Sequence, residues 1–172
     1  MPESDVTGHD DVEAIIEIPK GGRNKYEYDA ERGVIFLDRR LFSATVYPSD
    51  YGFIPDTLAE DGDSLDVLVI VDDSTFPGCH IMIKPVGVFR MSDEHGPDNK
   101  ILGLPANDPQ AQAVDGLEQL PPLLIEEIAH FFHVYKDLEP GKDTVVHGFA
   151  GADEAWAEIE ACRERYRSTK QP

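Results

Sequence analysis

The sequence Asp61-Gly62-Asp63-Ser64-Leu65-Asp66 runs directly into Val67-Leu68-Val69-Ile70-Val71, and this stretch is the most informative part of the chain. Its second half is apolar enough to predict a fully buried strand. Three carboxylates lie at the start of that strand, and Gly62 lets the backbone bend so that they can converge. Carboxylates this close shift one another's pKa values unless cations lie between them. Hard divalent ions such as Mg²⁺ prefer such oxygen clusters, so the stretch predicts a metal site on a core strand.

A calcium-binding EF-hand loop is the common alternative for an Asp-x-Asp run, and the sequence excludes it. Counted from Asp61, position 6 is Asp66 instead of glycine, and position 12 is Asp72 instead of glutamate. An unbroken apolar run fills the positions between them, and no helices are predicted on either side.

The composition of the 172 residues is that of one globular domain, which we place at residues 12–168 behind a flexible extension at residues 1–11. No apolar segment is long enough to span a membrane, and the acidic start does not resemble a signal peptide. We therefore expect a cytoplasmic protein whose two cysteines are reduced. The 15 Lys and Arg against 34 Asp and Glu give a net charge of −19, which argues against nucleic acid as a partner.

The order of the predicted elements favours a β-rich α+β fold. Alternating or apolar patterns predict strands, and two late helices follow from apolar residues at steps of three and four. The region from Tyr47 to Pro55 is rich in Pro and Gly and predicts an ordered loop, and residues 91–99 predict a polar loop. Many short strands followed by two helices indicate a small closed or partly closed β-barrel core. The strands are predicted at residues 12–18, 24–29, 34–38, 67–71, 80–90 and 100–104. The first helix is predicted to start at Pro121-Pro122 and to be ended by Pro140-Gly141, and the second to run from Ala152 to a last turn that contains Arg167.

A second acidic group, Asp93 and Asp98 around Glu94, lies in the predicted polar loop, two residues before Lys100. Together with the first acidic group it predicts a centre for several metal ions, the kind of site that serves phosphoryl transfer. Such a site also needs cations for the phosphate oxygens. The basic residues placed beside acidic or aromatic elements are Lys25, Arg39, Lys100 and Lys136.

At this point the chain resembles the soluble family I inorganic pyrophosphatases, and His95 resembles the actinobacterial branch of that family. The resemblance covers residues 12–166 and depends on motifs that occur in the family's order. These are Ile16-Glu17-Ile18-Pro19, Lys25-Tyr26-Glu27, Leu37-Asp38-Arg39, Tyr47-Pro48, Asp50-Tyr51-Gly52, Asp61 to Asp66, Pro85-Val86-Gly87, Asp93-Glu94, Asp98-x-Lys100, His130-Phe131-Phe132 and Tyr135-Lys136-Asp137-Leu138.

The resemblance implies hydrolysis of pyrophosphate to two phosphates on an OB-like barrel, with several Mg²⁺ ions, usually in a homo-hexamer. It implies a metal-bound water as the nucleophile and Asp63 as the general base. It also implies that one ion is shared by Asp61, Asp66 and Asp98. The full set of implied metal ligands is Asp61, Asp66, Asp93, Asp98, Glu27 and, through water, Glu17. The implied substrate-binding residues are Lys25, Arg39, Tyr51, Lys100, Tyr135 and Lys136.

Two other functions remain open at this stage. One is a Mg²⁺-dependent phosphohydrolase that acts on a nucleotide, and the other is a non-catalytic OB-like module with a structural metal. Ser64 departs from the family's signature, which usually has Pro or Glu there, and we expect it to soften the loop that carries Asp63. His130 and His133 have a spacing that can bind zinc, but no third ligand accompanies them, so packing is favoured.

Overall fold

The computed structural model of the chain describes residues 11–171, so residues 1–10 of the predicted extension lie outside the described residues. Strands predominate and two long helices come late, which confirms the predicted β-rich α+β class. The strands are β1 Val12–Ile18, β2 Asn24–Asp29, β3 Val34–Arg40, β4 Asp50–Ile54, β5 Leu65–Val69, β6 His80–Asp93, β7 Gly96–Pro97, β8 Lys100–Pro105 and β9 Thr144–Ala150. The helices are α1 Pro109–Gln112, the short 3-10 helix η1 Leu117–Gln119, α2 Pro122–Val134 and α3 Ala152–Thr169.

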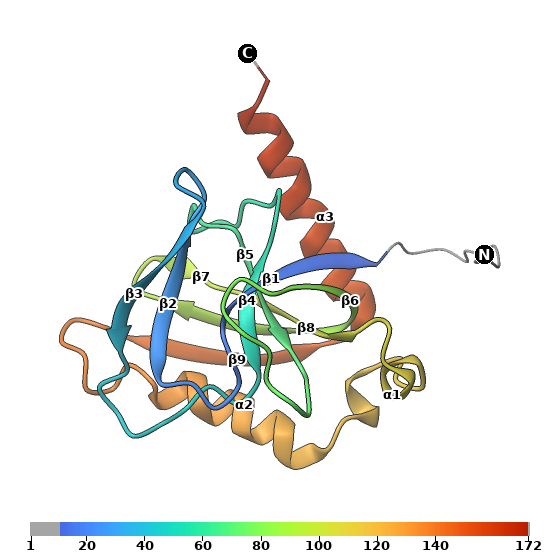
Figure 1. Ribbon diagram of the computed structural model, residues 1–172, viewed down its shortest axis with the longest axis horizontal. Helices are drawn as coiled ribbons and strands as arrows, with labels where there is room; N and C mark the ends of the chain where they lie inside the picture. The colour runs from blue at the N-terminus through green and yellow to red at the C-terminus, as the bar shows by residue number, and fades with distance from the viewer. Residues whose placement is uncertain (1–10, 172) are drawn as a thin grey trace.

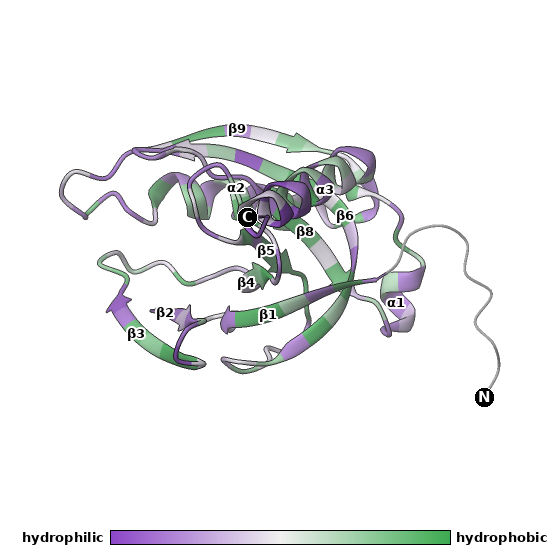
Figure 2. Ribbon diagram, turned by 90° about the horizontal axis from the view of Figure 1, so that it is seen from above, coloured by the Kyte–Doolittle hydropathy of each residue, from purple (hydrophilic) through white to green (hydrophobic). Residues whose placement is uncertain are grey.

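The main sheet closes on itself in a ring. Its strands follow the order β1-β4-β5-β8-β6, and β6 pairs again with β1, while β7 and β9 attach to the long strand β6. Strands β5 and β8 are parallel and the other pairs are antiparallel. Strands β2 and β3 form a separate antiparallel pair, and they lie at the opposite end of the molecule from α1 in both views (Figures 1 and 2). The ring agrees with the small closed barrel core that the sequence predicted.

Strand β5 is the predicted core strand, and it starts two residues earlier than the sequence pattern suggested. Leu65, Val67, Leu68 and Val69 are fully buried, so the apolar run lies in the interior as expected. Asp66 is therefore a carboxylate within a buried strand. The parallel pairing places it directly beside Lys100 of β8, which brings the two predicted acidic groups together.

The predicted loop at residues 47–55 is wrong in its second half, where Asp50–Ile54 forms β4. This strand lies between β1 and β5, and tertiary pairing overrides the low strand propensity of its residues. Gly52 is required there, because a Cβ atom at this position would lie 1.9 Å from the carbonyl oxygen of Ile15. The glycine that suggested a loop thus permits a close approach of two strands.

Other elements also differ from the sequence prediction. Strand β6 continues to Asp93, and β7 pairs with its end, so the predicted polar loop at residues 91–99 is largely a hairpin. Helix α2 ends at Val134, and Tyr135 caps it with a hydrogen bond of 2.8 Å from its N–H to the Phe131 carbonyl. Strand β9 was missed, because it is only partly buried and its pairing with β6 becomes visible only in the fold.

Two groups of buried side chains fill the interior. Helix α2 contributes Phe131 and Phe132 to an aromatic group that includes Tyr47 and Phe89, and helix α3 packs Ile159 and Cys162 against the opposite group. Strand β1 is mostly hydrophobic in Figure 2, and its middle residues Ala14, Ile15 and Ile16 are all buried. Both cysteines are free thiols, as predicted. Within residues 11–171, none of the helices has the length and apolarity that crossing a bilayer requires.

Candidate active site

A pocket of about 550 Å³ lies where the β2–β3 pair faces β4, the start of β5, the β6–β7 hairpin and the segment after α2. It brings together residues from segments that are far apart in the sequence. All of the predicted site residues except Lys100 line it, namely Glu17, Lys25, Glu27, Arg39, Tyr51, Asp61, Asp63, Asp66, Asp93, Asp98, Tyr135 and Lys136. The predicted acidic groups and the predicted cations therefore share one cavity.

Lys100 lies below the pocket floor, with only 1% of its side chain exposed. Its Nζ donates hydrogen bonds to Asp66 Oδ2 at 2.8 Å, Asp98 Oδ1 at 2.9 Å and the Tyr51 hydroxyl at 3.0 Å. The Tyr51 hydroxyl in turn donates to Asp66 Oδ2 at 2.7 Å. Burial opposes the charge on Lys100, but the two carboxylates raise its pKa above the ordinary value. Lys100 thus fixes Asp66, Asp98 and Tyr51 as one unit.

Burial, together with neighbouring carboxylates, raises the pKa values of three acidic groups of the pocket. Burial, opposed by Lys100 but reinforced by the charge of Asp98, raises the pKa of Asp66 to about 6. Burial likewise raises the pKa of Asp61, and the nearby charges of Asp98 and Asp63 add to this. Glu17 has its pKa raised to about 7, mainly by burial. Burial is the largest cause of all three shifts, so ionising these carboxyl groups is costly unless positive charge is added beside them.

The carboxylates of the pocket are chemically suited to a hard cation, but in the described part of the chain their side chains do not form a complete metal-binding arrangement. Among residues 11–171, no group of three or more His, Cys, Asp and Glu side chains is arranged to hold a metal ion. The ammonium group of Lys100 bridges Asp66 and Asp98, and Lys136 Nζ lies 3.7 Å from Asp93 Oδ2. The donors nevertheless are carboxylate oxygens that converge on one cavity, the type of ligand that Mg²⁺ prefers, so the residues present fit such ions.

Asp63 lies at the pocket edge in a tight turn. Gly62 has a φ of +91°, a backbone conformation that favours glycine. Its N–H donates a hydrogen bond of 3.1 Å to the Ala59 carbonyl and closes the turn. The Asp63 N–H donates to Asp61 Oδ1 at 3.1 Å. The Asp63 side chain is exposed, and no hydrogen bond to its carboxylate is found among the described residues. Its oxygens are therefore available to accept a proton from a bound molecule.

The β2–β3 pair supplies cations to the opposite wall. Lys25 forms ion pairs with Glu27 and with Asp38, the latter at 3.5 Å. Arg39 forms ion pairs with Asp38 and with Glu139, the latter at 2.7 Å. The pairing of β2 with β3 places Lys25 directly opposite Arg39, so two positive side chains face the cavity together.

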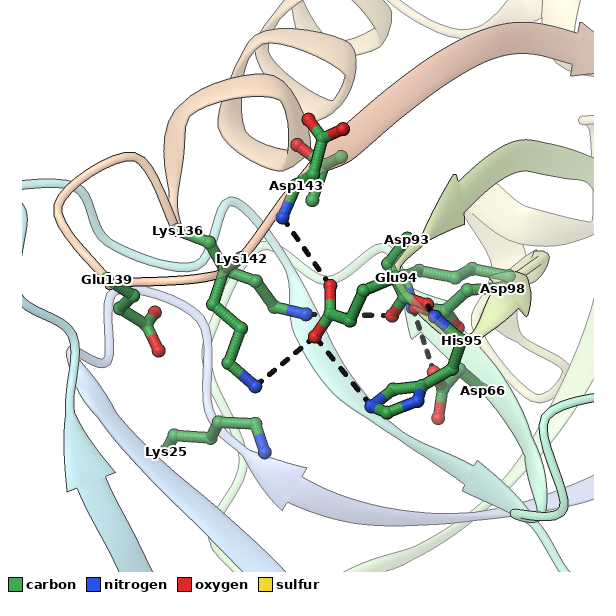
Figure 3. A network of polar contacts seen from close by, with 12 residues as sticks. Lys25, Asp66, Asp93, Glu94, His95, Asp98, Lys136, Glu139, Lys142 and Asp143 are labelled. Carbon is green, nitrogen blue, oxygen red and sulfur yellow. Dashed lines mark hydrogen bonds and ion pairs between the residues drawn. The ribbon is translucent and has the colours of Figure 1, made fainter.

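The pocket rim contains residues that the sequence reasoning missed or left open. Glu94 accepts from Lys142 at 3.2 Å and lies 3.8 Å from His95, as Figure 3 shows. Burial opposes the shift, but hydrogen bonds from its own backbone and from Lys142 lower the pKa of Glu94 to about 2. His95 also lies on the pocket wall. The sequence placed Glu94 in the second acidic group without giving it a role, whereas Lys142 gave no signal because only the fold brings it to the rim.

The sheet closes in a ring, and the pocket beside it joins carboxylates to cations and tyrosines. This combination is typical of a hydrolase of phosphoryl compounds. Comparison with known proteins narrows this class. The family model for inorganic pyrophosphatase matches residues 14–167. The chain therefore belongs to the inorganic pyrophosphatase family.

Individual relatives agree along the whole length. The inorganic pyrophosphatase of Streptomyces coelicolor is 52% identical over 157 residues, which cover 91% of this chain and 96% of the relative. That of Methanosarcina acetivorans is also 52% identical, over 94% of this chain and 96% of the relative. Among solved structures, the Helicobacter pylori inorganic pyrophosphatase has a TM-score of 0.90 at 38% identity, covering 96% of this chain and 99% of that one. The Thermus thermophilus enzyme has a TM-score of 0.89 at 43% identity and 97% coverage of both chains.

Proposed function

We propose that this protein hydrolyses inorganic pyrophosphate to two orthophosphates with the help of several Mg²⁺ ions. The observation that carries the proposal is the pocket itself, in which nine acidic side chains would repel a polyanion unless cations were added. Membership of the inorganic pyrophosphatase family gives the substrate. The residues that would hold the ions are Asp61, Asp66, Asp93, Asp98, Glu27 and, through water, Glu17.

When bound, divalent ions neutralise phosphate oxygens and lower the pKa of water toward neutrality. The protein's own residues transfer the proton and position the substrate. Asp63, whose carboxylate has no hydrogen-bond partner among residues 11–171, takes a proton from the attacking water. One P–O bond forms to that water, and the bond from the same phosphorus to the bridging oxygen breaks, so the second phosphate leaves.

The cations and hydroxyl groups hold the two phosphoryl groups in line for attack. Lys25 and Arg39 approach from the β2–β3 pair, and Lys136 follows Tyr135 at the end of α2. Lys100 acts from below by holding the Tyr51 hydroxyl and Asp66 in place. Positioning and charge neutralisation are the main contributions that in-line phosphoryl transfer needs from a protein.

The direct test is phosphate release from pyrophosphate with and without Mg²⁺, with ATP as a competing substrate. We expect rapid, Mg²⁺-dependent release from pyrophosphate and little from ATP. Faster release from ATP would instead favour the nucleotide phosphohydrolase. Folding without any turnover would favour a non-catalytic module.

The proposal also includes the localisation, oligomeric state and partners of the protein. We infer a cytoplasmic homo-hexamer, with residues 12–168 as its single domain and without nucleic-acid or membrane partners. The net charge of −19 supports the absence of nucleic-acid binding. Light scattering coupled to size exclusion would give the mass in solution, and a mass other than six times 19.1 kDa would refute the hexamer.

A further inference from the structure

Arg39 is a candidate for binding phosphate, and the position of its backbone in β3 does not by itself orient its side chain. It lies near the end of β3, in the pair that stands apart from the main ring. Across that pair it faces Lys25, and two like charges directly opposite each other repel. The orientation of its guanidinium group must therefore come from other contacts.

Glu139 provides such a contact from a different part of the fold. It lies in the turn after α2, where its N–H donates to the Lys136 carbonyl at 2.9 Å. Its side chain is only 5% exposed, and Oε1 accepts an ion-pairing hydrogen bond from Arg39 Nη2 at 2.7 Å. Its other oxygen, Oε2, is buried without a partner among residues 11–171. A buried carboxylate is costly unless it is paired, so Arg39 is the group that compensates Glu139.

The remaining contacts of Arg39 leave donors for a ligand. Nη1 pairs with the adjacent Asp38 and Nη2 with Glu139, which leaves a second N–H group on each of these nitrogens, and Arg39 lines the pocket. A guanidinium group has five N–H donors in a rigid plane, so two carboxylates can fix that plane without using all of them. Burial opposes the charge of Arg39, but Glu139 and Asp38 raise its pKa above the ordinary value, so it stays positive.

We propose that Glu139 is a positioning residue for the reaction: from the segment after α2 it holds the Arg39 guanidinium plane in the orientation that receives phosphoryl oxygens. This inference rests on the proposed function of the pocket. The competing role for the ion pair is purely structural, a link between the β2–β3 pair and the segment after α2. The two roles differ in what the loss of the Glu139 charge changes: positioning alters kcat/KM and phosphate binding and needs Arg39 to do so, whereas a structural link alters only the stability of the fold.

A double-mutant cycle separates them. The proteins are the unmutated chain, Glu139→Gln, Arg39→Ala and the double variant. Each is measured for kcat and KM on pyrophosphate with Mg²⁺, and for the Kd of inorganic phosphate by calorimetry. Glutamine keeps the shape of the side chain but removes its charge. Glu127→Gln is the matched control, because Glu127 is exposed on α2 and has no ion pair among the described residues.

We expect Glu139→Gln to lower kcat/KM about tenfold and to weaken phosphate binding several-fold, because misplaced binding groups are costly in phosphoryl transfer. In the Arg39→Ala background the same substitution should change either quantity less than about twofold, since the group it positions is gone. Glu139→Asp, which keeps the charge on a shorter side chain, should recover part of the loss. The Glu127→Gln control should match the unmutated protein.

Equal effects of Glu139→Gln in both backgrounds would overturn the proposal. So would a lower thermal unfolding midpoint with unchanged kcat/KM and phosphate Kd, which is the signature of a structural link alone. If the unmutated protein released no phosphate from pyrophosphate, the proposed function would fail. The phosphate Kd values would still decide the role of Glu139, because they do not require turnover.

Discussion

Replacing Lys100 by methionine tests the central claim about the pocket, that a buried ammonium group compensates its carboxylates. Lys100 is almost wholly buried and donates to Asp66, Asp98 and Tyr51. Methionine preserves most of the volume but removes the charge. Asp66 and Asp98 then lose their only hydrogen-bonding cation among residues 11–171.

The expected loss of stability follows from the burial of this group. Breaking a buried ion pair by removing one partner costs about 3–5 kcal/mol, because the other charge stays buried. For a domain of this length each kcal/mol lowers the unfolding midpoint by about 2–4 °C, so the midpoint should fall by about 6–20 °C. The loss should be smaller at pH 5.5 than at pH 8. Without the lysine, the pKa of Asp66 rises above its present value of about 6, and at the lower pH its protonated form carries no charge.

The assay is thermal unfolding followed by circular dichroism, with EDTA and then with Mg²⁺. Magnesium should restore more of the midpoint in Lys100→Met than in the unmutated protein, since a divalent ion can occupy the place of the lost charge. Lys84→Met is the matched control. Lys84 pairs with the exposed Asp115 at 3.0 Å, an exposed type of pair worth about 0–1 kcal/mol. Midpoints of the two variants within about 2 °C of each other would refute the reasoning.

Three further predictions concern the reaction, the fold and the charge. Asp63→Asn should keep the fold and Mg²⁺ binding but slow phosphate release from pyrophosphate by about 10²-fold or more, and near-normal turnover would remove Asp63 from its role. Gly52→Ala should lower the unfolding midpoint, because its Cβ would lie 1.9 Å from the Ile15 carbonyl oxygen, whereas Gly33→Ala, with nothing within 4 Å of its Cβ, provides a comparison. Gly33 has a φ of +63° and so carries only backbone strain. Raising KCl from 0.1 to 1 M should raise the midpoint, because salt screens the repulsion within a chain of net charge −19, and a midpoint that falls or stays constant contradicts this.

The sequence was a good guide wherever a local pattern had one physical meaning. The apolar run Val67–Val71 predicted a buried strand, and the stripe from Leu124 to Tyr135 predicted the helix that packs against the core. It failed for β4, where Pro and Gly suggested a loop. That strand exists because β1 and β5 pair with it on both sides, and no residue within the segment carries this information.

For the site as well, the sequence predicted what depends on local pattern and missed what depends on tertiary contacts. The acidic stretch from Asp61 to Asp66 and its family resemblance identified which residues belong to the pocket, since type and spacing of carboxylates are local properties. Glu139 and Lys142 could not be found in this way, because each becomes relevant only through a partner that is distant in the sequence.

By itself, the sequence determined the chemistry: carboxylates at the start of a core strand, a few cations, and a strand-rich domain around them. Only the tertiary structure decided which of these groups meet. The parallel pairing of β5 with β8 places Lys100 beside Asp66, and the segment after α2 brings Glu139 to Arg39. Burial then sets the strength of those contacts, because a charge that is removed from water must find its partner within the fold.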